Sequence, residues 1–364
     1  MTELSTETSM VHSANATEDK VISALTQFAA DNGHESLSRH LNELHRWIGF
    51  GSGALDAELA QIQAGPHASL AQTAAAYLIS QPGKRIRPLC VTLSAALGDK
   101  GAHPSVSKIA AAAELVHNAT LLHDDVIDEG TQRRGVEAAR VVYGNSISIL
   151  AGDHMLLEAL KLVESTGLSV IEFLNIITEI VTAEAWQLEA RTKFDPSRER
   201  YLKVIGGKTA SLFRWSLMSG GKIAGLTDQQ VKALGLAGDA LGNAFQLVDD
   251  LLDIGGDTAS IGKDAMQDLR EGKLTWPLLI GAERDAELSS TLKKIVSDHS
   301  TKIDDKTAKW IVNKLKETDA IKDTIEFARE QGQVALSNLE SMPKGSALEA
   351  LKSLVHATMA RAVT

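Results

Sequence analysis

The sequence predicts an all-α protein. Aromatic residues make up only 4% of the 364-residue chain and Pro occurs 7 times, whereas Ala and Leu recur throughout. This composition suits long helices better than sheets. From Val21 to Arg200 the apolar residues mostly recur three or four positions apart, which is the spacing of one helical face. Because the chain is 44% hydrophobic and 23% charged, we expect it to be globular with a sizeable buried core.

The expected elements follow each other along the chain without an obvious linker. Residues 1–20 are rich in Ser, Thr, Glu and Asn with no apolar period, and we expect a flexible N-terminal tail there. Residues 21–364 are predicted to form one helical domain. The helix breaks are expected at Gln81-Pro82-Gly83, Gly98 to Pro104, Gly144-Asn145, Asp195-Pro196 and Gly255-Gly256-Asp257. The charged run from Lys293 to Glu317 is interpreted as a solvated outer face.

Composition also excludes several classes of function. A formal net charge of -10 argues against general affinity for nucleic acid, which needs a basic face. The one cysteine, Cys90, has no internal disulfide partner and lies in an apolar run, so we expect core packing and a reducing cytoplasm. The first residues lack the pattern of a secretory signal, and no stretch of 18 apolar residues predicts a membrane span.

Two acidic clusters carry the strongest chemical signal. Asp124, Asp125 and Asp128 lie in LLHDDVID, and a second set lies in FQLVDDLLD, each within an apolar helix. The second set comprises Asp249, Asp250 and Asp253. Carboxylates at i and i+4 share a helical face and repel each other, so a cation should compensate them. Mg²⁺ is the natural choice, since it takes one or two carboxylates and fills its octahedron with water and phosphate oxygens. Two such clusters facing one cavity would hold a diphosphate between them.

Basic residues accompany these clusters. Lys84 and Arg87 in GKRIRP are three apart after a Pro-Gly break, and we expect them to share the first turn of a helix, where cations and backbone N–H groups suit a diphosphate. Arg133 and Arg134 follow the first cluster in QRRG and supply fork-shaped donors. His117 precedes Asp124 by seven residues. Three further lysines lie in short motifs: Lys208 in GGKTAS, Lys263 in IGKDAMQD and Lys273 in REGKLTWP. The GKT sequence lacks P-loop spacing and a preceding strand, so a nucleotide site is rejected.

Five segments, in order, resemble the complete motif set of the trans-isoprenyl diphosphate synthases, most closely the long-chain octaprenyl, nonaprenyl and decaprenyl type. They are GKRIRP, ELVHNATLLHDDVIDEGTQRRG, GKTASLF, FQLVDDLLD and GKDAMQDLREGKLTWPLL. The resemblance extends from Leu70 to Ala282 and, more weakly, over the C-terminal helices. It implies an all-α fold of helices around a deep central cavity, normally as a homodimer, and head-to-tail condensation of isopentenyl diphosphate onto an allylic diphosphate.

The resemblance also assigns roles by position. It makes Asp124, Asp125, Asp128, Asp249 and Asp253 the metal-binding residues, with about three Mg²⁺ ions per active site. It places isopentenyl diphosphate on Lys84, Arg87, His117 and Arg134. It places the allylic diphosphate on Arg133, Lys208, Thr209, Gln246, Lys263 and Lys273. Catalysis would rest chiefly on Asp124, Asp128, Lys208 and Asp249.

Three positions depart from the family pattern, and three other functions remain open. Gln81-Pro82-Gly83 replaces the usual double Gly, Ala183 stands where Gly often precedes Glu184, and Trp186 enlarges the turn before Gln187. A short-chain farnesyl or geranylgeranyl diphosphate synthase would differ only in pocket depth. A terpene cyclase would have no use for Lys84 and Arg87, and a non-catalytic subunit of a heteromeric synthase should have lost an acidic cluster.

Product length is predicted from Ala119, five residues before Asp124. At 1.5 Å per residue it would lie about 7.5 Å below the metal-binding carboxylates. Short-chain members of the family commonly carry a bulky aromatic residue near this position, which closes the pocket. Ala112 and Ala113 further along are also small, so we expect a growing chain to pass this level and the product to be long.

Overall fold

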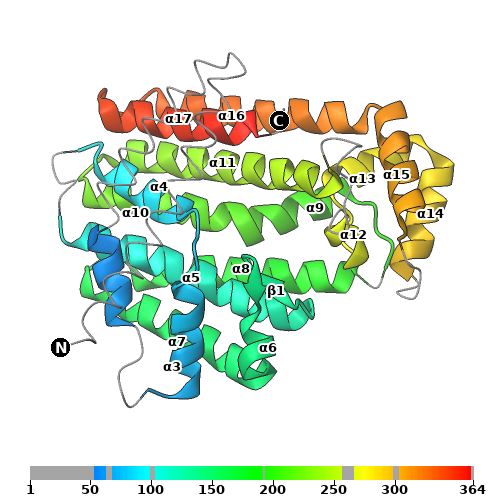
Figure 1. Ribbon diagram of the computed structural model, residues 1–364. Coiled ribbons are helices and arrows are strands. Elements are labelled where there is room, and N and C mark those ends of the chain that lie inside the picture. Colours follow the sequence, from blue (N-terminus) through cyan, green and yellow to red (C-terminus); the bar gives the residue numbers. More distant parts are fainter. Residues whose placement is uncertain are drawn as a thin grey trace, which may run out of the picture. The chain divides into compact units, whose positions relative to one another are not determined.

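The computed structural model describes residues 53–62, 68–98, 103–191, 193–255, 266–297 and 303–361. The predicted tail at residues 1–20 and the predicted site residue Lys263 lie outside them. Within the described residues the regular secondary structure is helical apart from one short hairpin, in which β1 (Gln132–Arg133) pairs antiparallel with β2 (Val136–Glu137). Figure 1 shows these helices in chain order. The predicted all-α fold class is confirmed.

The chain divides into two compact units, each described here by itself. The first unit comprises Met1–Phe173, Ser216–Val231 and Met342–Leu354, and the second comprises Leu174–Trp215, Lys232–Ser341 and Val355–Thr364. Four helices have residues in both: α8 (Val170–Ala190), α10 (Ser211–Ile223), α11 (Asp228–Ile254) and α17 (Ser346–Ala360). The expectation of a single domain around a central cavity stays a prediction.

The first unit is built on the long helix α5 (Ser105–Ile127), which packs against α4 and α7. Its other helices are α3 (Leu70–Ile79), α4 (Ile86–Ala95), α6 (Ala139–Tyr143) and α7 (Asn145–Ser165). Ala110, Ala111, Ala112 and Ala113 are all buried, because short side chains let neighbouring helices approach α5 from several sides. α3 begins with a capping box between Ser69 and Gln72, which satisfies the first unpaired amides.

The second unit has α13 (Trp276–Arg284) at the centre of its core, in contact with α14, α15 and α16. Its other elements are α9 (Arg198–Ile205), the π-helical turn η1 (Gly206–Ala210), α12 (Gln267–Arg270), α14 (Ala286–Ser297), α15 (Asp305–Glu317) and α16 (Ala320–Leu339). The run from Lys293 to Glu317, expected to be a solvated face, contributes Ile295, Ile311 and Leu315 to this core. The sequence interpretation missed that its charges cover only one side of two amphipathic helices.

Several predicted breaks fall where helices end. Gln81-Pro82-Gly83 lies between α3 and α4. Gly144 between α6 and α7 has φ 85°, and Gly255 after α11 has φ 86°, which are left-handed conformations that glycine adopts without steric cost. Among the described helices, none has the length and apolar character required to cross a membrane.

The close approach of α10 to α4 in the first unit gives a test of the packing. A Cβ at Gly220 would collide with the Ser94 hydroxyl and the Val91 carbonyl. Gly220→Ala should therefore lower the free energy of unfolding by about 1–3 kcal/mol, because well-packed backbones do not yield to an added methyl group. Gly206→Ala is the matched control, since a Cβ there meets nothing within 4 Å. Urea denaturation curves would contradict this packing if both variants unfolded at the wild-type midpoint.

Candidate active site

Both acidic clusters lie at the C-terminal ends of their helices, whereas the sequence analysis placed them inside. α5 ends at Ile127, and Asp128 is its C-cap, with its N–H donating to the Asp124 carbonyl at 2.7 Å. α11 ends at Ile254, directly after Asp253. The C-terminal end of a helix carries unpaired carbonyls and the negative end of the macrodipole. Carboxylates placed there are destabilised by the helix as well as by one another, so each cluster needs cations.

In the first cluster, one carboxylate already has a strong partner. Asp125 is buried at 1% exposure and accepts a hydrogen bond from Arg133 Nε at 2.9 Å. Asp124 and Asp128 are partly exposed. Asp125 and Arg133 are thus paired with each other in the structure. The predicted contacts of Asp125 with metal and of Arg133 with the allylic diphosphate stay predictions.

The two adjacent arginines are presented by the β1–β2 hairpin. Its two-residue turn is Arg134-Gly135, with φ 54° and 81°, as a type I′ turn requires. Arg133 reaches Asp125, whereas Arg134 donates to Asn118 Oδ1 at 3.2 Å and lies 3.4 Å from the Gln81 carbonyl. A left-handed conformation is unfavourable for arginine, so tertiary contacts must hold it.

The predicted isopentenyl diphosphate residues gather in the first unit around His117. Burial, and then the charges of Arg87, Arg134 and Arg133, hold the pKa of His117 well below its usual value. His117 is therefore a neutral imidazole among cations at pH 7. Lys84 is exposed and precedes α4, which begins at Ile86 after a left-handed Arg85 with φ 44°. The expectation that Lys84 and Arg87 share the first helical turn is wrong, because the helix starts two residues later.

The second unit contains a cavity of about 240 Å³. Four of the predicted allylic-site side chains line it, together with the acidic residues Asp250 and Asp268; the four are Lys208, Thr209, Gln246 and Lys273. Lys208 and Thr209 come from η1, Gln246 and Asp250 come one turn apart from α11, and Lys273 follows α12. Residues that are far apart in the sequence thus meet in one polar cavity.

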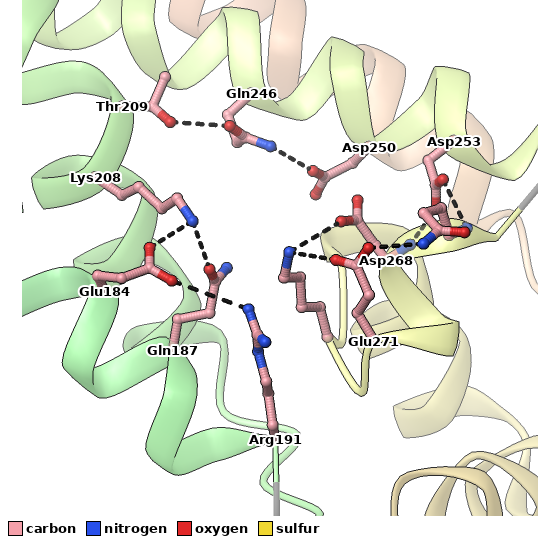
Figure 2. Close-up of polar contacts among 12 residues, drawn as sticks. Glu184, Gln187, Arg191, Lys208, Thr209, Gln246, Asp250, Asp253, Asp268 and Glu271 are labelled. Atoms are coloured by element: carbon pink, nitrogen blue, oxygen red, sulfur yellow. Dashed lines mark hydrogen bonds and ion pairs between the residues drawn. The ribbon is translucent and has the colours of Figure 1, made fainter. Parts of the chain in front are cut away.

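A chain of hydrogen bonds orders one wall of this cavity (Figure 2). Thr209 donates to Gln246 Oε1 at 2.9 Å, and Gln246 Nε2 donates to Asp250 Oδ1 at 3.0 Å. The other Asp250 oxygen accepts from the Tyr201 hydroxyl and from the Trp276 N–H. Burial, and then the charge of Asp268, raises the pKa of Asp250 to about 7. This carboxylate is fixed in place but has little compensating positive charge, so a cation in the cavity would stabilise its ionised form.

The two lysines of the cavity are held by glutamates. Lys208 forms an ion pair with Glu184 and a 2.8 Å hydrogen bond to Gln187 Oε1 (Figure 2). Lys273 pairs with Glu271 at 2.6 Å and lies 3.9 Å from Asp268. These contacts fix the ammonium groups in positions from which they can also reach an anion, because an ammonium has three donors.

The π-helical turn that carries Lys208 packs closely against α8. A Cβ at Gly207 would lie 2.7 Å from the Ala183 Cβ and 2.9 Å from the Glu179 carbonyl. Glycine thus lets η1 approach α8, and the small Ala183, one of the departures from the family pattern, lies at the contact. π-turns recur at functional sites because the extra residue redirects the following side chains.

The remaining residues of the second cluster, Asp249 and Asp253, do not line the cavity themselves. Asp249 pairs with Arg361 at 2.8 Å, and the Arg361 guanidinium lies 5.1 Å from the centre of the Phe245 ring. Asp253 accepts from the N–H groups of Gln267 at 2.9 Å and Asp268 at 3.2 Å. It thereby fixes the start of α12 and positions Asp268. The metal-binding role predicted for Asp249 and Asp253 stays a prediction.

Sequence reasoning missed several residues of the cavity. Asp268 was passed over although QDLREGK places it five residues before Lys273, which was the available signal. Glu184 and Gln187 are three apart on α8, a spacing that puts both on one helical face. Nothing in the sequence singles out Tyr201, because its partner Asp250 is 49 positions away.

The residues present fit a hard divalent cation. Their donors are carboxylate oxygens at two helix C-termini, which are the ligands that Mg²⁺ prefers. No three His, Cys, Asp or Glu side chains in the described part of the chain form a ready-made metal cage. Mg²⁺ does not need one, since it keeps several waters and is commonly held by one or two carboxylates together with substrate phosphates.

Comparisons with known proteins identify the family of this chain. The family model "Polyprenyl synthetase" matches residues 68–315. The chain is 36% identical to the octaprenyl diphosphate synthase of Escherichia coli over 290 residues, covering 78% of this chain and 88% of that protein. Among solved structures, the decaprenyl diphosphate synthase of Rhodobacter capsulatus has a TM-score of 0.81 and 33% identity, covering 88% of this chain and 98% of that one.

A third similar protein was solved with ligands. It is the polyprenyl synthase from Caulobacter crescentus, described as complexed with calcium and isoprenyl diphosphate, with a TM-score of 0.80 and 30% identity over 87% of this chain and 97% of that one. The fold and these matches define an all-α prenyltransferase. The chain belongs to the polyprenyl synthetase family, and the reaction class predicted from the sequence is confirmed.

The depressed pKa of His117 gives a pH test of the first unit. Below about pH 6.5 the unfolded state takes up a proton on this histidine and the folded state does not, so the free energy of unfolding falls as the pH falls, by at most ~1.4 kcal/mol per pH unit. His117→Asn should flatten this part of the profile between pH 7.5 and 5.5, measured by urea denaturation. The exposed His103→Asn is the control and should leave the slope unchanged. Equal slopes for wild type and the His117 variant would contradict the desolvated, cation-surrounded setting.

Proposed function

We propose that this enzyme binds an allylic diphosphate in the cavity of its second unit and extends it repeatedly with isopentenyl diphosphate to a long all-trans polyprenyl diphosphate. The observation that carries the site assignment is the convergence of Lys208, Thr209, Gln246 and Lys273 on one cavity with Asp250 and Asp268. Cations and hydroxyl or amide donors there match the oxygens of a diphosphate, and the carboxylates match the metal that accompanies it.

Mg²⁺ is the proposed cofactor. Asp124, Asp125 and Asp128 would hold it at the end of α5, and Asp249 and Asp253 would hold it at the end of α11. When bound, it would neutralise charge that builds up on the departing diphosphate. The calcium in the Caulobacter crescentus protein supports a divalent cation, and hard oxygen donors in this chain favour Mg²⁺.

Isopentenyl diphosphate is assigned to the first unit. Its diphosphate would bind the positive charges of Arg87, Arg134 and Lys84. The neutral His117 would donate a ring N–H beside them and add no positive charge that repels these cations. The arginines are fork-shaped donors suited to phosphate oxygens. Arg133, held by Asp125, is assigned to the allylic diphosphate together with the residues of the cavity and Lys263.

The chain's own groups then direct the bond changes. Lys208 and Lys273 stabilise the leaving diphosphate as the C–O bond of the allylic substrate breaks and the diphosphate takes the electron pair. The alkene of isopentenyl diphosphate attacks the resulting allylic cation and forms the new C–C bond. A proton leaves the adjacent carbon for the released diphosphate, and the product is an allylic diphosphate longer by one isoprene unit.

A short-chain synthase is the main alternative, since it would use the same groups and differ in pocket depth. The octaprenyl and decaprenyl synthases among the similar proteins favour the long product. Retention of both acidic clusters speaks against a non-catalytic subunit, and the cations around His117 speak against a cyclase with one substrate. We also propose that the enzyme acts as a homodimer in the cytoplasm.

The decisive assay uses the full chain with labelled isopentenyl diphosphate, farnesyl diphosphate and Mg²⁺. Dephosphorylated products are separated by chain length on a reversed-phase column. Products well beyond geranylgeraniol support the proposal, whereas a single addition identifies a short-chain enzyme. Label that stays in isopentenyl diphosphate would refute the proposed reaction.

The metal-binding role of each acidic cluster can be tested by mutation. Asp124→Ala or Asp249→Ala should lower turnover by about 10²-fold or more, because each removes a group whose main use is in the transition state. Each substitution should also weaken Mn²⁺ binding, which electron paramagnetic resonance measures in the presence of saturating pyrophosphate. The exposed Asp228→Asn, at the opposite end of α11, is the control. Wild-type metal binding and turnover in both alanine variants would show that the metal lies elsewhere.

Product length is tested at Ala119, which is fully buried on α5. If the growing chain passes this level, Ala119→Phe should shorten the product to roughly three or four isoprene units, because the ring would lie about 7.5 Å below the carboxylates. The first condensation should stay fast. A tightly packed site would instead lose about 1–3 kcal/mol of stability, which thermal denaturation detects. A stable variant that still makes the full-length product would contradict the assigned path.

A further inference from the structure

Asn118 is a buried polar residue to which the sequence analysis gave no role. It lies on α5 directly after His117, with 1% of its surface exposed. Its amide nitrogen donates to the Glu114 carbonyl at 2.9 Å and to Glu114 Oε1 at 3.1 Å. Its amide oxygen accepts from Arg134 Nη2 at 3.2 Å. One buried amide thus joins an acid on α5 to the arginine at the tip of the hairpin.

The chemistry of the two neighbours fixes the amide orientation. A carboxylate only accepts hydrogen bonds, and a guanidinium only donates them. The amide nitrogen must therefore face Glu114 and the oxygen must face Arg134. Glu114 is itself 4% exposed, so removing the amide would leave a buried carboxylate with one donor fewer. An asparagine meets both demands without a net charge.

Arg134 needs such support because its backbone is strained. It adopts φ 54° in the two-residue turn, where Asn or Gly is the ordinary choice. Its guanidinium atoms also lie 3.2 Å from where a Cβ of Gly83 would be, and 3.4 Å from the Gln81 carbonyl. The Gln81-Pro82-Gly83 loop and Asn118 thus both contact this guanidinium. Strained residues of this kind persist where surrounding contacts over-determine them.

The adjacent arginines are held by different chemistry. Arg133 is paired with the carboxylate of Asp125, which offsets its charge. Asn118 holds Arg134 through a neutral oxygen, which orients the guanidinium and adds no negative charge. An anionic substrate gains from both properties, because pre-organisation lowers the entropic cost of binding and the positive charge is preserved.

We propose that Asn118 is a positioning residue for isopentenyl diphosphate. Glu114 holds the Asn118 amide in place, and the amide oxygen orients Arg134. The inference rests on the proposed assignment of Arg134 to this substrate. It extends that assignment to a residue that touches neither substrate and fixes the direction of the guanidinium that does.

The first experiment compares steady-state kinetics of wild type, Asn118→Leu and the isosteric Asn118→Asp. The Michaelis constant for isopentenyl diphosphate should rise about tenfold or more in both variants. The leucine loses the hydrogen bond that orients Arg134, and the aspartate adds a negative charge that offsets the Arg134 charge. The constant for farnesyl diphosphate should change less than about twofold, as expected for an effect on uniform binding of one substrate. Thr120→Val, which loses only a hydroxyl bonded to the His117 carbonyl on the same helix, is the control. Asn118→Thr, which can both donate and accept, should recover part of the loss.

A double-mutant cycle separates positioning from general packing. In an Arg134→Ala background, Asn118→Asp should change the constant for isopentenyl diphosphate by less than about twofold, because the residue acts only through Arg134. Additive effects would overturn the proposal, as would an Asn118→Asp protein with wild-type constants. A wild-type enzyme that makes no product refutes the proposed function itself, whereas an active wild type with additive variants refutes only the role of Asn118.

Discussion

The site is organised by carboxylates placed where a helix least tolerates them. α5 and α11 each end in an acidic cluster, beside the negative end of the macrodipole and the last unpaired carbonyls. Within each unit the chain supplies cations to these groups, Arg133 to Asp125 and Arg361 to Asp249. Such an arrangement costs stability unless a cation is bound. A divalent cation bound beside these carboxylates would therefore have a built-in driving force, since it would repair an electrostatic defect of the protein itself.

The cationic side chains need contacts that fix their positions and still leave donors and positive charge available to an anion. Lys208 and Lys273 are each fixed by a glutamate at the edge of the cavity, and a lysine retains further donors when one is in use. Desolvation and the charges of nearby arginines keep His117 neutral by lowering its pKa, and the Asn118 amide orients Arg134 without offsetting its charge. These neutral groups allow several cations to lie close together, because they satisfy donors and acceptors and add no like charge.

The sequence predicted the helices, the two acidic motifs and most of the cations, because each is a local pattern. Periodicity marks α5 and α11, and the spacing of DDxxD marks a helical face whether or not the helix continues. Helix ends were less predictable: α4 begins at Ile86 because Arg85 turns left-handed, and no residue type at that position signals it. Tyr201 and Asn118 escaped notice for another reason. Their partners Asp250 and Arg134 come from other elements of the same unit, and such contacts leave no trace in local spacing.

Backbone strain links these observations. Five non-glycine residues among those described have positive φ: Arg85, Glu129, Arg134, Met266 and Asp319. The first four lie in or directly beside motifs assigned to the site: Arg85 follows Lys84, Glu129 follows Asp128, and Met266 starts the short helix that carries Asp268. Each such residue costs about 1–3 kcal/mol unless neighbouring contacts compensate. At Met266 the compensation is visible, because its N–H donates to the Asp253 carbonyl at 2.8 Å and the Asp253 side chain accepts from the next two amides. A carboxylate of the second acidic cluster thus stabilises the strained turn that places Asp268 in the cavity, and the same interactions that hold the fold also set the geometry of the site.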